Sequence, residues 1–289
     1  GGLFDVKLVV TDSRGKVSSN TAHRLIEVQN TSSPSAAQLL NISSRLRVQL
    51  GDNTLIGGFI ITGTDTKRVA LRAVGPSTKV NGFLSDPMLE LYNSAGTRLS
   101  ANDDWMNSPD RAEIESRGLA PEDSREAVIF HTLDPGAYTA VVRGKNNGTG
   151  IGLVEAYDLQ LTNNSQFANL STRGFVETGD NVLIGGFIAG NRNGSITALV
   201  RALGPSLPAT VPNRLSNPIL ELHNENGATL AMNDNWEDSQ KAAIQQTGIP
   251  PTDARESAIY ISLAPGAYTA IVRGVNSTGN GLVEVYSIP

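Results

Sequence analysis

The sequence predicts an all-β protein made of two tandem antiparallel β-sandwich domains, each with one short helix, preceded by an N-terminal β-hairpin. Three observations support this fold class: the chain repeats itself once, each repeat contains short runs of strand-forming residues, and the first 30 residues have no counterpart in either repeat. At 289 residues with 39% hydrophobic content, the chain is long enough for two domains that each bury a core.

The internal repeat is visible in collinear matches along the chain. GDNTLIGGFI from Gly51 matches GDNVLIGGFI from Gly179 at an offset of 128, and PGAYTAVVRG from Pro135 matches PGAYTAIVRG from Pro265 at an offset of 130. Solenoid units are much shorter, about 20–50 residues, so each copy is a domain. We therefore expect repeat 1 at 39–161, a linker at 162–168 and repeat 2 at 169–289.

Short strands separated by turn residues fill both repeats. Runs such as RVALRAV, EAVIFHTL and AYTAVVRG are rich in β-branched and aromatic residues, and clusters of Gly, Pro, Asn and Asp separate them. This pattern is typical of an antiparallel sandwich. In AYTAVVRG, Tyr138, Ala140 and Val142 fall on one face of the predicted strand, as the two-residue period of a strand requires.

One segment in each repeat has helical signals instead. SPDRAEIESRG offers Ser108 as an N-cap, Pro109 as the first helical residue and Gly118 as the stop, and DSQKAAIQQTG ending at Gly248 repeats the pattern. We expect a short helix in each repeat that covers one end of the sandwich.

The segment 1–30 reads as two strands around the turn Asp12–Gly15, followed by a linker at 31–38. A lone hairpin is only marginally stable in water, so its apolar side needs a surface to dock on, either in this chain or at the sheet edge of another molecule. The residues expected to mediate this docking are Phe4, Val6, Leu8, Val10, Ile26 and Val28.

Composition argues against several partner classes. The formal net charge of −5 and the pI near 5.3 do not favour nucleic acid or an anionic membrane, because both require clustered Lys and Arg. The sequence has no cysteine, which removes disulfides and thiolate chemistry, and it has no apolar run of transmembrane length. We expect no membrane insertion and no nucleic-acid partner.

Two resemblances narrow the functional class. The hairpin, through FDVKLVVTDSRG, resembles the last two strands of PKD-like or Ig-like domains of bacterial surface proteins. The repeats, through LELYNSAGTRLSANDDW and LDPGAYTAVVRG, are similar to the jelly-roll modules of bacterial pre-peptidase C-terminal domains, which occur in tandem in large secreted proteins. The resemblance implies a jelly-roll-like fold, an extracellular or cell-surface location and a non-catalytic role; some such relatives bind calcium.

An Asn- and Asp-rich stretch precedes a tryptophan in both repeats, SANDDW and AMNDNW. Calcium takes six to eight hard oxygen ligands, which such a loop and a distant carboxylate can supply. The alternative is that these side chains cap the following helix and bind turn amides, and this alternative is favoured. The candidate calcium ligands are Asn102, Asp103, Asp104 and Asp123 in repeat 1, and Asn233, Asp234, Asn235 and Asp253 in repeat 2.

The two tryptophans, Trp105 and Trp236, are the only ones in the chain and occupy equivalent positions. An exposed ring would make a sugar-binding platform, whereas a buried ring would pack beneath the short helix. We favour the buried ring, since an aromatic content of 5% leaves few rings for a binding strip.

Charged residues and histidines do not indicate an active site. Arg72, Glu90, Arg143 and Glu155 recur in repeat 2 as Arg201, Glu221, Arg273 and Glu284, which favours cross-strand ion pairs over catalytic carboxylates. The three histidines, His23, His131 and His223, have no histidine at the equivalent positions. We expect no enzymatic activity.

The sequence thus favours an extracellular structural or adhesive protein that assembles with itself, head to tail, through strand addition by the hairpin. The alternative is a carbohydrate-binding accessory region of a larger secreted enzyme, which would bind polysaccharide through exposed tryptophans.

Overall fold

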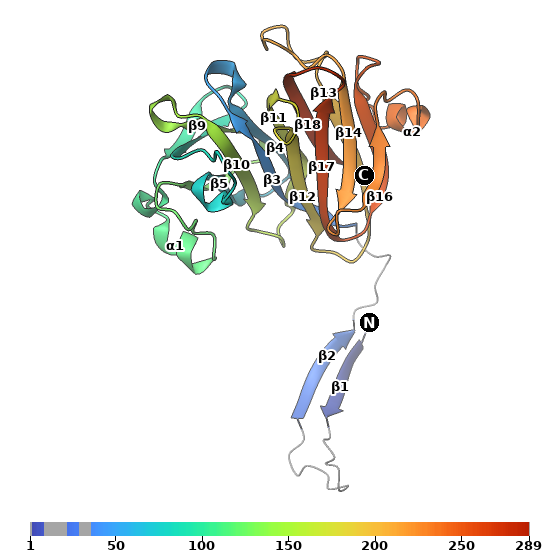
Figure 1. The fold of residues 1–289 in the computed structure, drawn as a ribbon. Helices are drawn as coiled ribbons and strands as arrows, with labels where there is room; N and C mark the ends of the chain where they lie inside the picture. The colour runs from blue at the N-terminus through green and yellow to red at the C-terminus, as the bar shows by residue number, and fades with distance from the viewer. Residues whose placement is uncertain (1, 9–21, 29–35, 289) are drawn as a thin grey trace, which may run out of the picture. The chain divides into compact units, whose positions relative to one another are not determined.

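The computed structural model describes the backbone of residues 2–8, 22–28 and 36–288, and the side chains from residue 36 onward (Figure 1). The chain divides into two compact units, Gly1–Ser35 and Ala36–Pro289. Strands β1 (Gly2–Leu8) and β2 (Ala22–Val28) of the first unit pair antiparallel, with Phe4 opposite Ile26. The predicted hairpin is therefore present, while its turn and Val10 lie outside the described residues.

Repeat 1 is an eight-stranded sandwich. One of its sheets has the strand order β3-β10-β5-β8 and the other has the order β4-β9-β6-β7. This is the strand order of a jelly roll, which combines two four-stranded sheets. The strands are β3 (Gln38–Val48), β4 (Leu55–Gly63), β5 (Lys67–Val74), β6 (Pro87–Asn93), β7 (Arg98–Asn102), β8 (Ala127–Leu133), β9 (Gly136–Gly144) and β10 (Gly150–Asp158).

Repeat 2 has the same topology, with the orders β11-β18-β13-β16 and β12-β17-β14-β15. The predicted all-β fold class is thus confirmed in both repeats. The strands are β11 (Ser165–Val176), β12 (Leu183–Gly190), β13 (Ile196–Leu203), β14 (Pro218–Asn224), β15 (Thr229–Asn233), β16 (Ser257–Leu263), β17 (Gly266–Gly274) and β18 (Gly279–Ile288).

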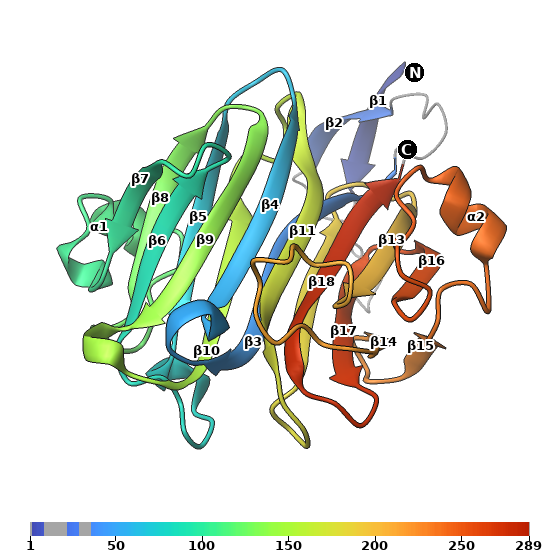
Figure 2. The same cartoon turned by 90° about the horizontal axis from the view of Figure 1, so that it is seen from above.

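The sheets of the two repeats are continuous with each other. Strand β11 pairs with β4, which places Ser171 opposite Gly58 (Figure 2), and β3 pairs with β12, which places Ser43 opposite Gly186. Each ladder therefore joins four strands of one repeat to four of the other. Sheet I runs β15-β14-β17-β12-β3-β10-β5-β8, and sheet II runs β7-β6-β9-β4-β11-β18-β13-β16.

The two repeats are related by a pseudo-two-fold axis that passes between β3 and β11. Only near such an axis do equivalent residues of two copies contact each other. Three side-chain hydrogen bonds each join positions 128 residues apart: Gln38 to Gln166 at 2.7 Å, Thr172 to Ser44 at 2.6 Å, and Gln49 to Glu177 at 2.7 Å.

The repeats share one hydrophobic core, which corrects the predicted division into two separate domains. A single cluster of buried residues includes Phe59 and Phe167, whose rings lie 5.5 Å apart although they belong to different repeats. Residues 165–168, expected in a linker, begin β11, and Gln38 begins β3. The first strand of each repeat, β3 or β11, joins the two repeats because it pairs with the second strand of the other repeat.

A short helix lies beside the sandwich in each repeat, as predicted, but begins later than expected. Helix α1 spans Arg111–Ser116 and α2 spans Lys241–Gln246. The N-cap position of α1 is Asp110, which makes no side-chain capping hydrogen bond, and the predicted cap Ser108 instead accepts a hydrogen bond from the Asp110 N–H at 3.2 Å in the turn before the helix. Gly118 adopts a φ of 67° after α1, the left-handed conformation that glycine favours at a helix end.

Candidate functional site

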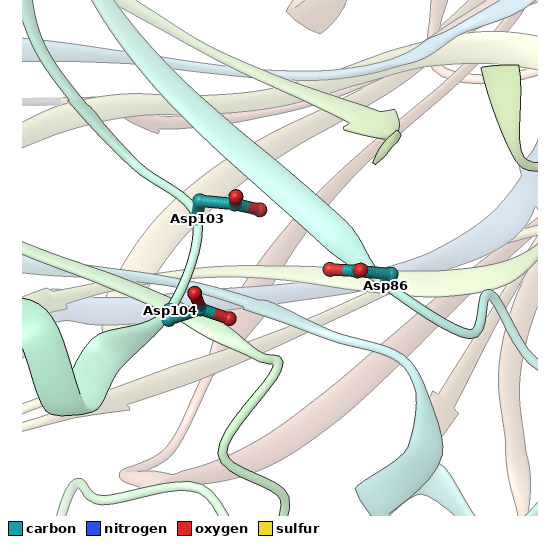
Figure 3. A group of neighbouring side chains, drawn as sticks. All are labelled: Asp86, Asp103 and Asp104. Carbon is teal, nitrogen blue, oxygen red and sulfur yellow. The ribbon is translucent and has the colours of Figure 1, made fainter. Parts of the chain in front are cut away.

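Three carboxylates of repeat 1 meet at one end of the β6–β7 hairpin (Figure 3). Asp86 precedes β6, while Asp103 and Asp104 follow β7. One oxygen from each lies within 4.8 Å of the others. The antiparallel register, with Leu89 opposite Asn102, brings these two chain segments together. We call Asp86, Asp103 and Asp104 the acidic cluster.

A lysine partly neutralises the acidic cluster. Lys145 Nζ lies 2.5 Å from Asp103 Oδ2 and 3.9 Å from Asp86 Oδ2. Burial raises the pKa of the Asp86 carboxyl above its ordinary value, and the charges of Asp103 and Asp104 add to this rise, whereas Lys145 opposes it. The cluster therefore gathers negative charge that one ammonium only partly balances.

Repeat 2 has the same arrangement with fewer charges. Its equivalents of the acidic cluster are Asn217, Asp234 and Asn235, and Val275 replaces Lys145. In both repeats the first two positions hold a buried oxygen without a hydrogen-bond partner: Asp86 Oδ1 and Asp103 Oδ1 in repeat 1, Asn217 Oδ1 and Asp234 Oδ1 in repeat 2. The geometry is thus conserved between the copies while its charge is not.

Two of the predicted ligands have structural roles instead. The Asn102 side chain donates to the Asp104 carbonyl at 3.2 Å and accepts from the Val128 N–H at 2.9 Å, so it holds β7 against β8. Asn233 does the same in repeat 2, with Asn235 at 3.0 Å and Ala258 at 2.9 Å. Asn102 and Asn233 thus bind backbone groups, as the alternative to calcium binding predicts.

The distant carboxylates expected to complete the sites point elsewhere. Asp123 and Asp253 each form an ion pair with the arginine two residues on, Arg125 and Arg255, at 2.7 Å. The hydrogen bond from Arg125 lowers the pKa of the Asp123 carboxyl. The structure groups Asp86, and not Asp123, with Asp103 and Asp104, and the residue equivalent to Asp86 in repeat 2 is Asn217. The position of Asp86 and Asn217 just before a strand that pairs with the Asp-rich strand was the available signal.

The acidic cluster fits a hard cation such as calcium in ligand type. Carboxylate oxygens are the ligands calcium prefers, and three of them lie close enough to share one ion. Glu126 is not part of the acidic cluster, because its buried carboxylate accepts hydrogen bonds from the backbone N–H groups of Gly75 and Ser77, both at 2.8 Å. A calcium ion at the cluster would supply positive charge in place of the Lys145 ammonium.

Both tryptophans are buried, as favoured from the sequence. Trp105 is 8% exposed and packs with Ile114 of α1, and Trp236 is 5% exposed and packs with Ile244 of α2. The Trp105 Nε1–H donates to the Asp123 carbonyl at 3.1 Å. The rings therefore hold the short helices against the sheets and present no open face to a sugar.

The repeated arginine and glutamate residues form cross-strand ion pairs, as predicted. Arg72 lies opposite Glu155, with Nε to Oε2 at 3.3 Å, and Arg201 lies opposite Glu284, with Nε to Oε2 at 3.1 Å. The Tyr286 hydroxyl donates to Glu284 at 3.0 Å, and burial raises its pKa to about 12. A neutral, hydrogen-bonded phenol beside a paired carboxylate is a structural arrangement.

Comparisons with known proteins place the chain in no family. No protein-family model matches it, and no curated protein matches it. Among solved structures, the STIV MCP shares 11% identity at a TM-score of 0.25, over 100% of this chain and 98% of that one. The collagen adhesin CNA from S. aureus shares 7% identity at a TM-score of 0.17, over 88% of this chain and 84% of that one. Within the described part of the chain, no helix is long and apolar enough to cross a membrane.

Proposed function

We propose that the protein is an extracellular, non-catalytic structural or adhesive protein that assembles head to tail through strand addition by its N-terminal hairpin. The observation that carries the proposal is the hairpin itself: among the described residues, β1 and β2 form a sheet of two strands. Such a hairpin gains stability from a third strand, and a neighbouring subunit can supply one. A head-to-tail contact that does not close gives a filament.

Of the two equivalent edge strands β15 and β7, β15 is better suited to the role of receptor. Strands β15 and β7 end equivalent sheets, and each pairs with one strand among residues 36–288. On β15, Leu230 is 41% exposed and Met232 is 61% exposed, whereas Ala101 of β7 occupies the position of Met232. An edge strand with exposed apolar side chains is suited to pairing with another chain.

We further propose that calcium occupies the acidic cluster and stiffens this end of the sandwich. The support is the trio of carboxylates within 4.8 Å of one another and the unpartnered oxygens at the same positions of both repeats. Repeat 2 has one carboxylate where repeat 1 has three, so a site there would bind calcium more weakly. The proposed relationship to pre-peptidase C-terminal domains and the proposed secretion accord with this role.

The assembly proposal is tested by comparing the full chain with a chain that lacks residues 1–35, using light scattering after size exclusion and electron microscopy. We expect oligomers or filaments of the full chain and monomers of the shortened chain. Monomeric behaviour of both chains would refute assembly through the hairpin.

The receiving edge is tested separately with a double substitution, Leu230→Lys with Met232→Lys, because charged residues on an edge strand oppose pairing. The matched control is Leu99→Lys with Ala101→Lys on β7. We expect the first pair to block assembly and the second to leave it intact, and the reverse result would assign β7 as the receptor instead.

A further inference from the structure

A groove lies on the outer face of sheet I where the two repeats meet. Its floor comes from β10, β3, β12 and β17, and its walls come from residues 80–81 of repeat 1 and 180–182 of repeat 2. The cavity volume is about 570 Å³, within the range of small-molecule sites. We call it the junction groove, and its defining residues are Arg45, Arg47, Val80, Ile151, Ile184 and Arg273.

The junction groove is positively charged in a protein of net charge −5. Arg45 and Arg47 alternate with buried Leu46 on β3, so both side chains face outward into the groove. Among residues 36–288, neither arginine has an ion-pair or side-chain hydrogen-bond partner. Arg273 also lines the groove, with Nε 3.5 Å from Glu221. Asp180 is the single acidic residue of the lining, so positive charge predominates.

Aliphatic side chains lie between these arginines. Arg45 stands opposite Leu153 on β10 and Ile184 on β12, and Arg47 stands opposite Ile151. A second hollow that shares Arg45 and Ile184 continues the groove across the sheet. The arginine stems can pack along this apolar floor while the guanidinium groups stay free for an anion.

Most of the backbone beneath the groove is engaged in the sheet, because β3 pairs with β12 as far as Arg45 and with β10 as far as Val48. Strand β3 pairs with β10 and β12, and β12 also pairs with β17. A bound peptide usually depends on main-chain hydrogen bonds at an exposed sheet edge, which most of this floor does not offer. Recognition therefore comes mainly from side chains, and it combines arginine forks, which match carboxylates, with an aliphatic surface that the C–H groups of a ligand can cover.

The pseudo-equivalent surface on sheet II is built differently. Arg173 corresponds to Arg45, but Phe175 replaces Arg47, and burial lowers the pKa of Arg173. The loop from Gly204 to Leu215 is two residues longer than the loop from Gly75 to Leu84, and it buries Val211 where Val80 stays partly exposed. The paired arginines thus belong to one face of the molecule.

We infer that the junction groove binds a carboxylate-bearing polysaccharide, with Arg45 and Arg47 holding successive uronate carboxylates and Ile151 and Ile184 contacting the sugar rings. The site requires both repeats, because β3 and β10 come from repeat 1 while β12 and β17 come from repeat 2. It lies on side chains of the second unit and is independent of assembly by the hairpin.

The test is a titration of the full chain with hexagalacturonate, followed by calorimetry at low salt. We expect saturable binding that weakens as sodium chloride is added, since charged contacts in an open groove are screened. Arg45→Gln and Arg47→Gln should each weaken binding about tenfold or more, the size expected for loss of a charge-assisted hydrogen bond. Arg45→Lys should bind less tightly than the natural chain but better than Arg45→Gln, because it keeps the charge and loses the fork.

The matched control is Arg143→Gln, at the position on sheet II that corresponds to Arg273, and it should bind like the natural chain. Unchanged thermal unfolding of each variant would confirm that the fold is intact. Absence of saturable binding, equal losses in Arg143→Gln and Arg45→Gln, or equal affinity for a neutral hexasaccharide would each overturn the inference. Tighter binding of poly-L-glutamate of the same charge would assign the groove to an acidic peptide and would also overturn it.

Discussion

Repeat 1 buries a charged pair at a position where repeat 2 has none. Lys67 Nζ lies 2.6 Å from Asp158 Oδ2, and it also donates to the Gln160 carbonyl at 2.9 Å. Both side chains are almost completely buried, and their equivalents in repeat 2 are Ile196 and Ser287. Equivalent positions of the two repeats therefore hold a buried ion pair in repeat 1 and an uncharged pair in repeat 2.

We predict that Lys67→Ile alone lowers the free energy of unfolding by about 3–5 kcal/mol at pH 7, because it leaves the Asp158 carboxylate buried without a cation. Adding Asp158→Ser should recover most of this loss, since the double variant copies repeat 2. Urea unfolding of the three chains measures both effects. A double variant as unstable as the single one would contradict the explanation.

The pH dependence of the single variant follows from the pKa of Asp158. Burial raises that pKa above its ordinary value of 3.8, and Lys67 opposes the rise. Removing Lys67 raises it further, and a group whose pKa is raised in the folded state destabilises the fold as pH rises through that pKa. The loss caused by Lys67→Ile should therefore be largest at pH 7 and should shrink as the pH falls toward 3.8.

The acidic cluster gives a second prediction from the same comparison of repeats. Lys145→Val copies Val275 of repeat 2 and leaves Asp86, Asp103 and Asp104 without their cation. In the presence of chelator, the melting temperature should fall, because three carboxylates then repel one another. In millimolar calcium it should rise by more than that of the natural chain, since an ion no longer competes with the ammonium.

Scanning calorimetry with calcium and with chelator measures this difference. Lys79→Val, which removes an exposed lysine paired with Glu122, is the control and should leave the calcium response unchanged. Identical melting curves with and without calcium in the natural chain and in Lys145→Val would rule out calcium at the cluster.

At the scale of elements, local sequence predicts the strands well and their long-range partners poorly. Runs such as AYTAVVRG become β9 because their alternation is a property of neighbouring residues. The pairing of β3 with β12 was not predicted, since two strands over 130 residues apart are brought together by packing of the whole core. The repeat offset located equivalent positions, but an offset alone does not show that equivalent residues touch.

The candidate sites show the same division between local and long-range signals. Asp103 and Asp104 stand out because they are adjacent, whereas Asp86 enters the acidic cluster through the β6–β7 register. The junction groove could not be predicted, because Arg45 and Arg47 line a groove only when β3 pairs with β12 of the other repeat. Trp105 was placed correctly since a large ring beside a short amphipathic helix is usually buried.

At the scale of the whole molecule, the chain is a dimer of repeats joined by covalent linkage. The ladders β3–β12 and β11–β4 are equivalent, with Ser43 opposite Gly186 and Ser171 opposite Gly58. Such an interface is isologous, so a true two-fold dimer of one repeat can form the same ladders. The two repeats differ near the axis, where Leu46 of repeat 1 is equivalent to Gly174 of repeat 2. A Cβ on Gly174 would lie 1.9 Å from Leu46 Cδ2.

We predict that residues 163–289, expressed alone, form a dimer in which β11 of each copy pairs with β12 of the other. Two glycines then face each other where the full chain has Leu46 and Gly174, which leaves a cavity. Gly174→Ala should therefore stabilise this dimer, whereas in the full chain it should lower the free energy of unfolding by about 1–3 kcal/mol through overpacking against Leu46. Sedimentation equilibrium measures the dimer, and urea unfolding measures the effect in the full chain. A folded monomer of residues 163–289, or the same sign of effect in both contexts, would show that the repeats do not depend on each other's first strand.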